Sequence, residues 1–201
     1  MQLLSTAVSV VALAVSLFAL WFSVLRRGKV CSTHPVFIAM RYDFVGKQFP
    51  QAKIFLRSLL YSTGKRGRVI ESLFLRVREG GRNAEFSFWG YGDKDLVRGS
   101  GLFVSEEGIA TNHHFNPIKA KGPFIFLGGT YSLELMAKVV RRRGLASLWA
   151  IDVTVPDGVF GTTIARENTI FFNWSPEQNK YIASVEKRSD ALHALSDPAD
   201  I

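Results

Sequence analysis

The segment Val69–Arg78, with the sequence VIESLFLRVR, decides the fold class of this chain. Leu73, Leu75 and Val77 alternate in it with bulky or charged side chains, which is the period of a β-strand with one buried face. The residues shortly before it, Ser62–Gly67 (STGKRG), and the glycine pair after it have the composition of turns. We therefore predict a strand that lies between two turns.

Similar short segments lie on both sides, separated by turn residues at regular intervals. The other predicted strands are Val36–Tyr42, Lys53–Tyr61, Glu85–Tyr91, Leu102–Val104, Ile109–Phe115, Phe124–Leu127, Tyr131–Val139, Leu145–Val155, Phe171–Trp174 and Tyr181–Val185. No alternation with long helices is seen, and a short helix is expected only within Asp157–Asn168. This pattern is typical of a mainly β chain, and we predict one antiparallel β-sandwich.

One of these strands is similar to a strand of immunoglobulin-like sandwiches. The stretch GGTYSLEL begins at Gly128 and resembles the entry into a late strand of that fold, in which a tyrosine hydroxyl bonds back to the preceding turn. The resemblance implies that Tyr131 is such a tyrosine and that the sandwich has an immunoglobulin-like topology.

The N-terminal segment Leu3–Leu25 contains no charged residue over 23 positions. A bilayer core of about 30 Å is crossed by roughly 20 helical residues, so the segment is long enough to span it. Trp21 lies near one end, where an interfacial aromatic is expected. A cleaved signal peptide is the alternative, but its positive charges precede the apolar run, whereas here they follow it. We predict an uncleaved single-pass transmembrane helix.

The charges beside this helix predict its orientation. Arg26, Arg27, Lys29 and Arg41 follow the helix, and only two uncharged side chains precede it. Lys and Arg close to a span favour the cytoplasmic side, so we expect the C-terminal domain in the cytoplasm. A single cysteine, Cys31, agrees with a reducing compartment. The predicted organisation is an anchor with its basic flank over 1–29, a β domain over 30–188 and a polar, flexible tail over 189–201.

The chain has a formal net charge of +8, which favours an anionic partner. Nucleic acid is one class of partner, but no aromatic platform for bases accompanies the basic clusters, so we do not expect it. The anionic inner leaflet is the simpler of these two candidates, and a solvated basic surface with no dedicated ligand is favoured over both. The candidate lipid-binding residues lie in two predicted turns: Lys65, Arg66, Arg68, Arg141, Arg142 and Arg143.

The stretch Gly99–Phe115, GSGLFVSEEGIATNHHF, resembles the segment of trypsin-like serine proteases that delivers the catalytic histidine. The resemblance implies that His114, or His113, would be the base of a hydrolase. Such an enzyme also needs a nucleophilic serine, and no Gly-x-Ser-Gly-Gly follows, so no catalytic residue is assigned. Adjacent strand residues point to opposite faces, so the two histidines do not form a metal site, and we expect one partly buried and one exposed. No cofactor is expected.

Small residues recur along one stripe of the predicted transmembrane helix. They are Ser5, Ser9, Ala12, Ser16, Ala19 and Ser23, at alternating spacings of four and three. Such stripes allow transmembrane helices to approach closely, and serine hydroxyls bond across the contact. The stripe predicts self-association of the helix, with chance composition as the alternative.

The apolar helix, its basic flank and the stretches FLRSLLYSTGKRGRVIESLFLRV and GSGLFVSEEGIATNHHF resemble a loose group of bacterial single-pass membrane proteins with a β-rich soluble domain. The resemblance implies that the protein is located in the bacterial inner membrane, and it implies no enzymatic activity. The leading hypothesis is a membrane-tethered, non-enzymatic module that binds a protein partner or acts as a scaffold. The alternatives are an anionic-lipid-binding domain and a hydrolase built on His113 or His114.

Overall fold

The computed structural model describes residues 2–26, 28–43, 51–91, 96–99, 101–118, 124–160 and 167–187. The chain begins with helix α1 (Gln2–Leu20), which continues as one π-helical turn (Trp21–Leu25). Twelve strands follow: β1 (Val30–Ser32), β2 (Phe37–Asp43), β3 (Gln51–Ser62), β4 (Arg68–Glu79), β5 (Arg82–Tyr91), β6 (Leu96–Arg98), β7 (Leu102–Val104), β8 (Ile109–Pro117), β9 (Gly129–Val139), β10 (Ala146–Val155), β11 (Asn168–Ser175) and β12 (Lys180–Lys187). The predicted mainly β class is confirmed.

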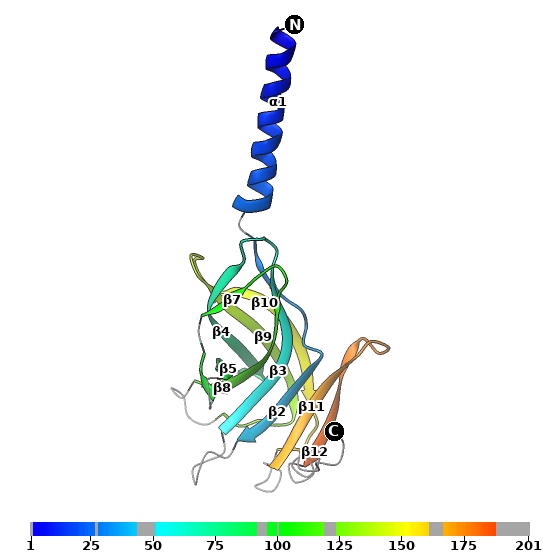
Figure 1. Ribbon diagram of the computed structural model, residues 1–201. Helices are drawn as coiled ribbons and strands as arrows, with labels where there is room; N and C mark the ends of the chain where they lie inside the picture. The colour runs from blue at the N-terminus through cyan, green and yellow to red at the C-terminus, as the bar shows by residue number, and fades with distance from the viewer. Residues whose placement is uncertain are drawn as a thin grey trace, which may run out of the picture.

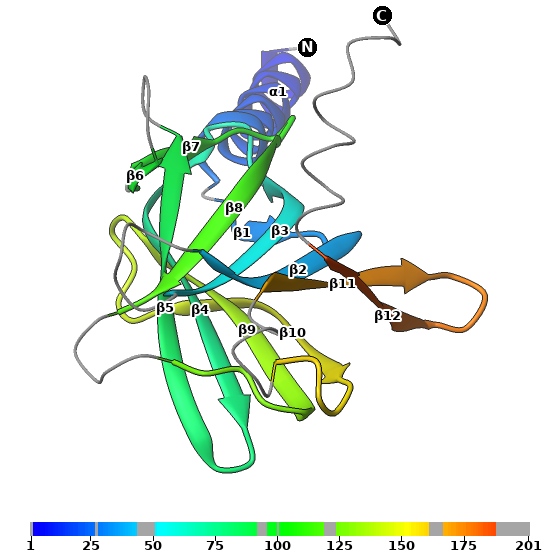
Figure 2. The ribbon, with the colours of Figure 1, turned by 90° about the horizontal axis from the view of Figure 1, so that it is seen from below.

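All strand pairs are antiparallel and belong to one sheet, in the order β10-β9-β4-β5-β8-β3-β2-β11-β12. The short strands β1, β6 and β7 pair with β3, β5 and β4. The sheet curls until β10 comes close to β1 and β12, and its shape is nearly that of a barrel (Figures 1 and 2). A division into two facing sheets and an immunoglobulin-like topology stay predictions.

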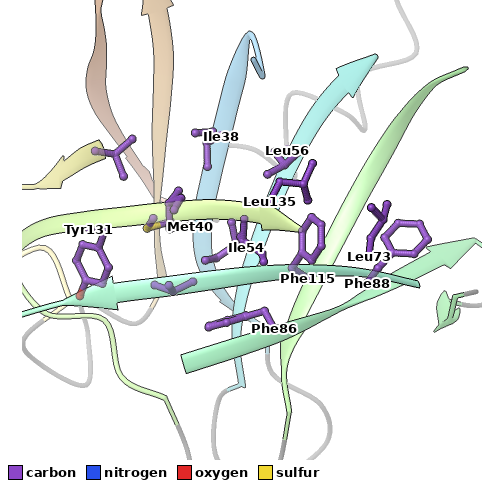
Figure 3. Close-up of a cluster of buried hydrophobic side chains, with 14 of the residues drawn as sticks. Ile38, Met40, Ile54, Leu56, Leu73, Phe86, Phe88, Phe115, Tyr131 and Leu135 are labelled. Atoms are coloured by element: carbon purple, nitrogen blue, oxygen red, sulfur yellow. The ribbon is translucent and has the colours of Figure 1, made fainter. Parts of the chain in front are cut away.

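The core lies inside this curled sheet, where alternate residues of neighbouring strands meet (Figure 3). Leu73, Leu75 and Val77 of β4 are all buried, as their period of two predicts. Phe115 of β8 is fully buried and pairs with Ile54 of β3. The strands form here because one face of each has a continuous apolar surface to bury against the others.

Helix α1 stands outside the β domain and leaves it at one end (Figure 1). Its described side chains are exposed along its length, so it buries no apolar face on the strands. The span Ser5–Ser23 is long and apolar enough to cross a membrane, with a mean hydropathy of 2.1. A signal sequence has the same properties, so an uncleaved anchor stays a prediction.

Tyr131 makes the bond that its sequence context predicts. It is fully buried, its hydroxyl donates to the Leu127 carbonyl at 2.9 Å, and the Leu127 N–H donates to the same hydroxyl at 2.7 Å. The predicted strand Phe124–Leu127 is wrong for a related reason. Its N–H groups bind tyrosine hydroxyls instead of a neighbouring strand, since the Phe126 N–H donates to the Tyr42 hydroxyl at 2.6 Å.

Replacement of Tyr131 by phenylalanine is expected to lower the free energy of unfolding by about 1–2 kcal/mol, because both bonds to Leu127 are lost and its backbone groups stay partly buried. Thermal unfolding of the full chain in detergent measures the effect. Tyr61→Phe is the control, since its hydroxyl makes no hydrogen bond to the described residues. Equal unfolding temperatures for the two variants would contradict the role of Tyr131.

Two short strands, Val30–Ser32 and Leu96–Arg98, were not predicted, because three residues are too few to show a period. Of the segment expected to hold a short helix, 157–160 form a turn and bend, and 161–166 lie outside the described residues. The predicted tail over 189–201 and Arg27 of the basic flank also lie outside them.

Candidate membrane-facing surface

The helix joins the β domain through a closely packed connection. The Thr63 N–H donates to the Lys29 carbonyl at 2.9 Å, and the Lys29 N–H donates to the Thr63 hydroxyl at 2.8 Å. Gly28 and Gly64 are in backbone contact, so that a Cβ on Gly64 would lie 2.6 Å from the Gly28 nitrogen and 3.2 Å from the Arg26 carbonyl oxygen. The turn between β3 and β4, which carries Lys65 and Arg66, therefore lies against the end of the helix.

The strand register places the second basic turn at the same end. Strand β4 starts directly after the β3–β4 turn, and the end of β9 pairs with this start, with Ile70 opposite Val139. The Val140 N–H then donates to the Val69 carbonyl at 3.0 Å. The β9–β10 turn, which carries Arg141–Arg143, consequently lies at the end of the barrel from which the helix leaves (Figure 1).

Five of the six predicted lipid-binding residues are exposed, and Arg68 is half-buried. Within the described part of the chain, none of the six forms an ion pair with a carboxylate. Among the described residues, three exposed acids lie near the same end: Glu106 and Glu107, and Glu71 in the first part of β4. The surface made of the two basic turns, here called the basic end, is therefore positive on balance.

Several cations elsewhere in the domain have acidic partners. Lys53 is buried and its ammonium lies 2.8 Å from the Asp43 carboxylate. Arg76 and Arg78 lie 3.2 and 3.4 Å from the same oxygen of Glu134. These pairs neutralise charge along the walls of the barrel, whereas the cations of the basic end stay available to an anionic partner.

Large apolar side chains are also exposed beside the basic turns. Phe103 is 60% exposed and pairs with Val69, which is 40% exposed. Val140 and Leu145, on the two sides of the arginine run, are 40% and 43% exposed. The sequence reasoning missed this group, because apolar residues in or beside short strands are typical of a core.

His113 and His114 point to opposite faces of β8, as predicted, but both are buried, so the expected exposure of one of them is wrong. His113 faces the core, where its ring lies 5.6 Å from that of Phe88. His114 is 5% exposed on the outer face, where the Phe55 ring, 4.8 Å away, covers it. A neighbouring strand, absent from any local pattern, supplies this cover.

Burial lowers the pKa of both histidines. The pKa of His113 falls to about 4 through burial, against a smaller opposite effect of the Ser58 backbone. The pKa of His114 falls to about 4 through burial first and the positive charges of Lys53 and Arg41 next. A fully buried His113 offers no access to a substrate, so this geometry gives no support to the hydrolase alternative.

Within the described ranges, no group of three or more His, Cys, Asp or Glu residues lies close enough together to hold a metal ion. Cys31 is a free, partly buried thiol on β1. The expectation that no metal or cofactor is bound stays a prediction.

The hairpin β11–β12 carries a shallow hollow of about 560 Å³. Trp174 and Ile182 line it and are 37% and 42% exposed. The hairpin projects sideways from the wall of the curled sheet (Figure 2). This hollow is another surface with exposed apolar side chains, and nothing in the sequence singled it out.

The small-residue stripe lies on a continuous exposed helix. The hydroxyls of Ser9, Ser16 and Ser23 donate to the carbonyls of Ser5, Ala12 and Ala19, at 3.0, 2.8 and 2.6 Å. Each serine thus satisfies its donor within the helix and presents a small surface outward. Self-association through this stripe stays a prediction.

No protein-family model matches the chain, and no curated protein matches it either. The resemblances to bacterial membrane-anchored proteins and to a protease segment therefore stay predictions.

Proposed function

We propose that this protein is a non-enzymatic membrane module whose N-terminal helix anchors it and whose β domain rests with its basic end on the anionic surface of the same membrane. One observation carries the proposal. The turn with Lys65 and the turn with Arg141–Arg143 are 76 positions apart at their closest by sequence number, and both lie at the end where the helix leaves the domain. The proposed location is a bacterial inner membrane with the domain in the cytoplasm, where anionic lipids attract basic segments.

The packed connection supports this function. Because Gly64 contacts Gly28 and the Arg26 carbonyl, a helix that spans the bilayer holds the β3–β4 turn beside the headgroups. Each Lys or Arg near an anionic surface contributes about 1 kcal/mol, and salt weakens the attraction. The exposed cations of the basic end, with no acidic partner in the described residues, supply the charge for such a contact.

Amine acetylation of the full chain in lipid nanodiscs tests this function. Lys65 is expected to react about fivefold more slowly in discs that contain phosphatidylglycerol than in pure phosphatidylcholine, since one such contact is worth about 1 kcal/mol. Lys180, also exposed but on the hairpin, is the internal control and should react at one rate in both. High salt should abolish the difference. Equal rates for Lys65 in both discs would contradict the proposal.

A protein-binding or scaffold role is the second candidate function. The observation that favours it is the hollow on β11–β12, where Trp174 and Ile182 are exposed on a projecting hairpin that carries neither basic turn. Exposed apolar patches rimmed by polar residues are typical of interaction sites. The two candidates use different faces of the domain, so both can hold in one molecule.

A further inference from the structure

The basic end carries apolar side chains that the attraction of charges does not explain. On β4 and β7 the residues that face inward, Ile70 and Val104, are buried and belong to the core. Val69 and Phe103 face outward opposite each other, and the Val140 N–H donates to the Val69 carbonyl. The three side chains therefore form one exposed group, here called the apolar wedge.

The wedge lies directly beside the basic turns. A Cβ on Gly67 would lie 2.6 Å from the Phe103 ring, so this ring lies against the turn that carries Lys65 and Arg66. Val140 precedes Arg141 in the chain. Basic residues that surround exposed aromatic and aliphatic side chains are typical of surfaces that bind the membrane interface, where charges meet phosphates and apolar groups enter the acyl boundary.

The length of the helix places the wedge near this boundary. From Gln2 to Leu25 the α-helix and its π-helical turn extend about 36 Å at 1.5 Å per residue. The hydrocarbon core is about 30 Å thick, and headgroups extend the bilayer to about 40–45 Å. A spanning helix therefore ends within the headgroup layer, and the turn packed against its end begins there.

We propose that Phe103, with Val69 and Val140, inserts into the interface of the leaflet from which the helix emerges, while the neighbouring cations bind lipid phosphates. This inference rests on the proposed function and adds the apolar part of the same surface. The occupant is the bilayer that holds the helix, because that helix delivers the wedge to it and because the surrounding charge is complementary to anionic lipid.

A solvent-sensitive fluorophore tests the insertion. The chain carries Cys31→Ser, so that Phe103→Cys provides the one thiol to be labelled with a nitrobenzoxadiazole dye. In phosphatidylglycerol-containing nanodiscs the emission is expected to shift to shorter wavelength and to lose intensity when doxyl lipids are added. The matched control is Ile125→Cys, which is 42% exposed and lies outside the basic end, and which should show neither effect.

The outcomes separate this inference from the proposed function. A dye at position 103 that behaves like the dye at position 125, in discs where Lys65 is protected, would overturn the insertion and leave the contact of the basic turns in place. A dye that enters lipid while Lys65 stays fully reactive would support the insertion and overturn the electrostatic contact. A dye in water together with a reactive Lys65 would overturn both.

Discussion

Acidification from pH 7.5 to 4.5 is expected to destabilise the β domain by about 2–3 kcal/mol through His113 alone. Its pKa falls from 6.5 to about 4 on burial in the folded chain. Between these values the unfolded state binds more protons than the folded state, so stability is complete above pH 6.5 and is lost as the pH falls towards 4. His114, whose pKa is also lowered, acts in the same direction.

His113→Leu should reduce the slope of this pH dependence to the part that His114 supplies, because leucine fills a similar volume between Phe88 and Phe115 and binds no proton. Denaturant unfolding of the full chain at several pH values measures the slope. Leu135→Met, a change of similar volume at another fully buried position, is the control and should keep the slope of the parent. A slope in His113→Leu equal to that of the parent would show that His113 is not the group that titrates.

Phe115→Ala is expected to lower the free energy of unfolding by about 3–5 kcal/mol, the range for loss of a buried phenylalanine ring. Phe115 is fully buried, and its ring centroid lies 6.1 Å from that of Phe88. Neighbouring strands hold both sides of β8, so the cavity collapses only in part.

Phe103→Ala is the matched control for this change, since the ring is 60% exposed. In detergent without anionic lipid it should alter stability by no more than about 0.5 kcal/mol, as surface substitutions do. Thermal and denaturant unfolding of both variants give the comparison. A loss at Phe103 as large as that at Phe115 would place Phe103 in the core and remove the basis of the apolar wedge.

Local patterns predicted most strands, because each strand buries one face and its period is visible along the chain. Leu73, Leu75 and Val77 show this, and Tyr131 bonds back to Leu127 as its context predicts. Phe124–Leu127 is as apolar as a strand, but two tyrosine hydroxyls take its N–H groups, and no local pattern shows that they are near. The pattern of one strand does not reveal which strand it pairs with, because a pairing such as that of β3 with β8 depends on the arrangement of the whole sheet.

The basic residues of the candidate site could be predicted from the sequence. Their meeting at one end of the domain and the exposed apolar residues beside them could not. The arginine run Arg141–Arg143 and the turn with Lys65 were visible as basic clusters, but their meeting at one end depends on the register of β4 with β9. The exposure of Phe103 could not be predicted, because Leu102–Val104 has the composition of a buried strand. His114 was misjudged because the ring that covers it, Phe55, belongs to another strand.

The contact between Gly28 and Gly64 has a mechanical consequence, because it couples the orientation of the β domain to that of the helix. A loose tether would let the domain keep its orientation while the helix tilted, but a turn packed against the backbone of Arg26 moves with the helix axis. A helix longer than the hydrocarbon core accommodates a thinner bilayer by tilting. In the proposed anchored protein, a change in lipid thickness is therefore expected to tilt the whole domain, with the largest displacement at the parts farthest from the helix.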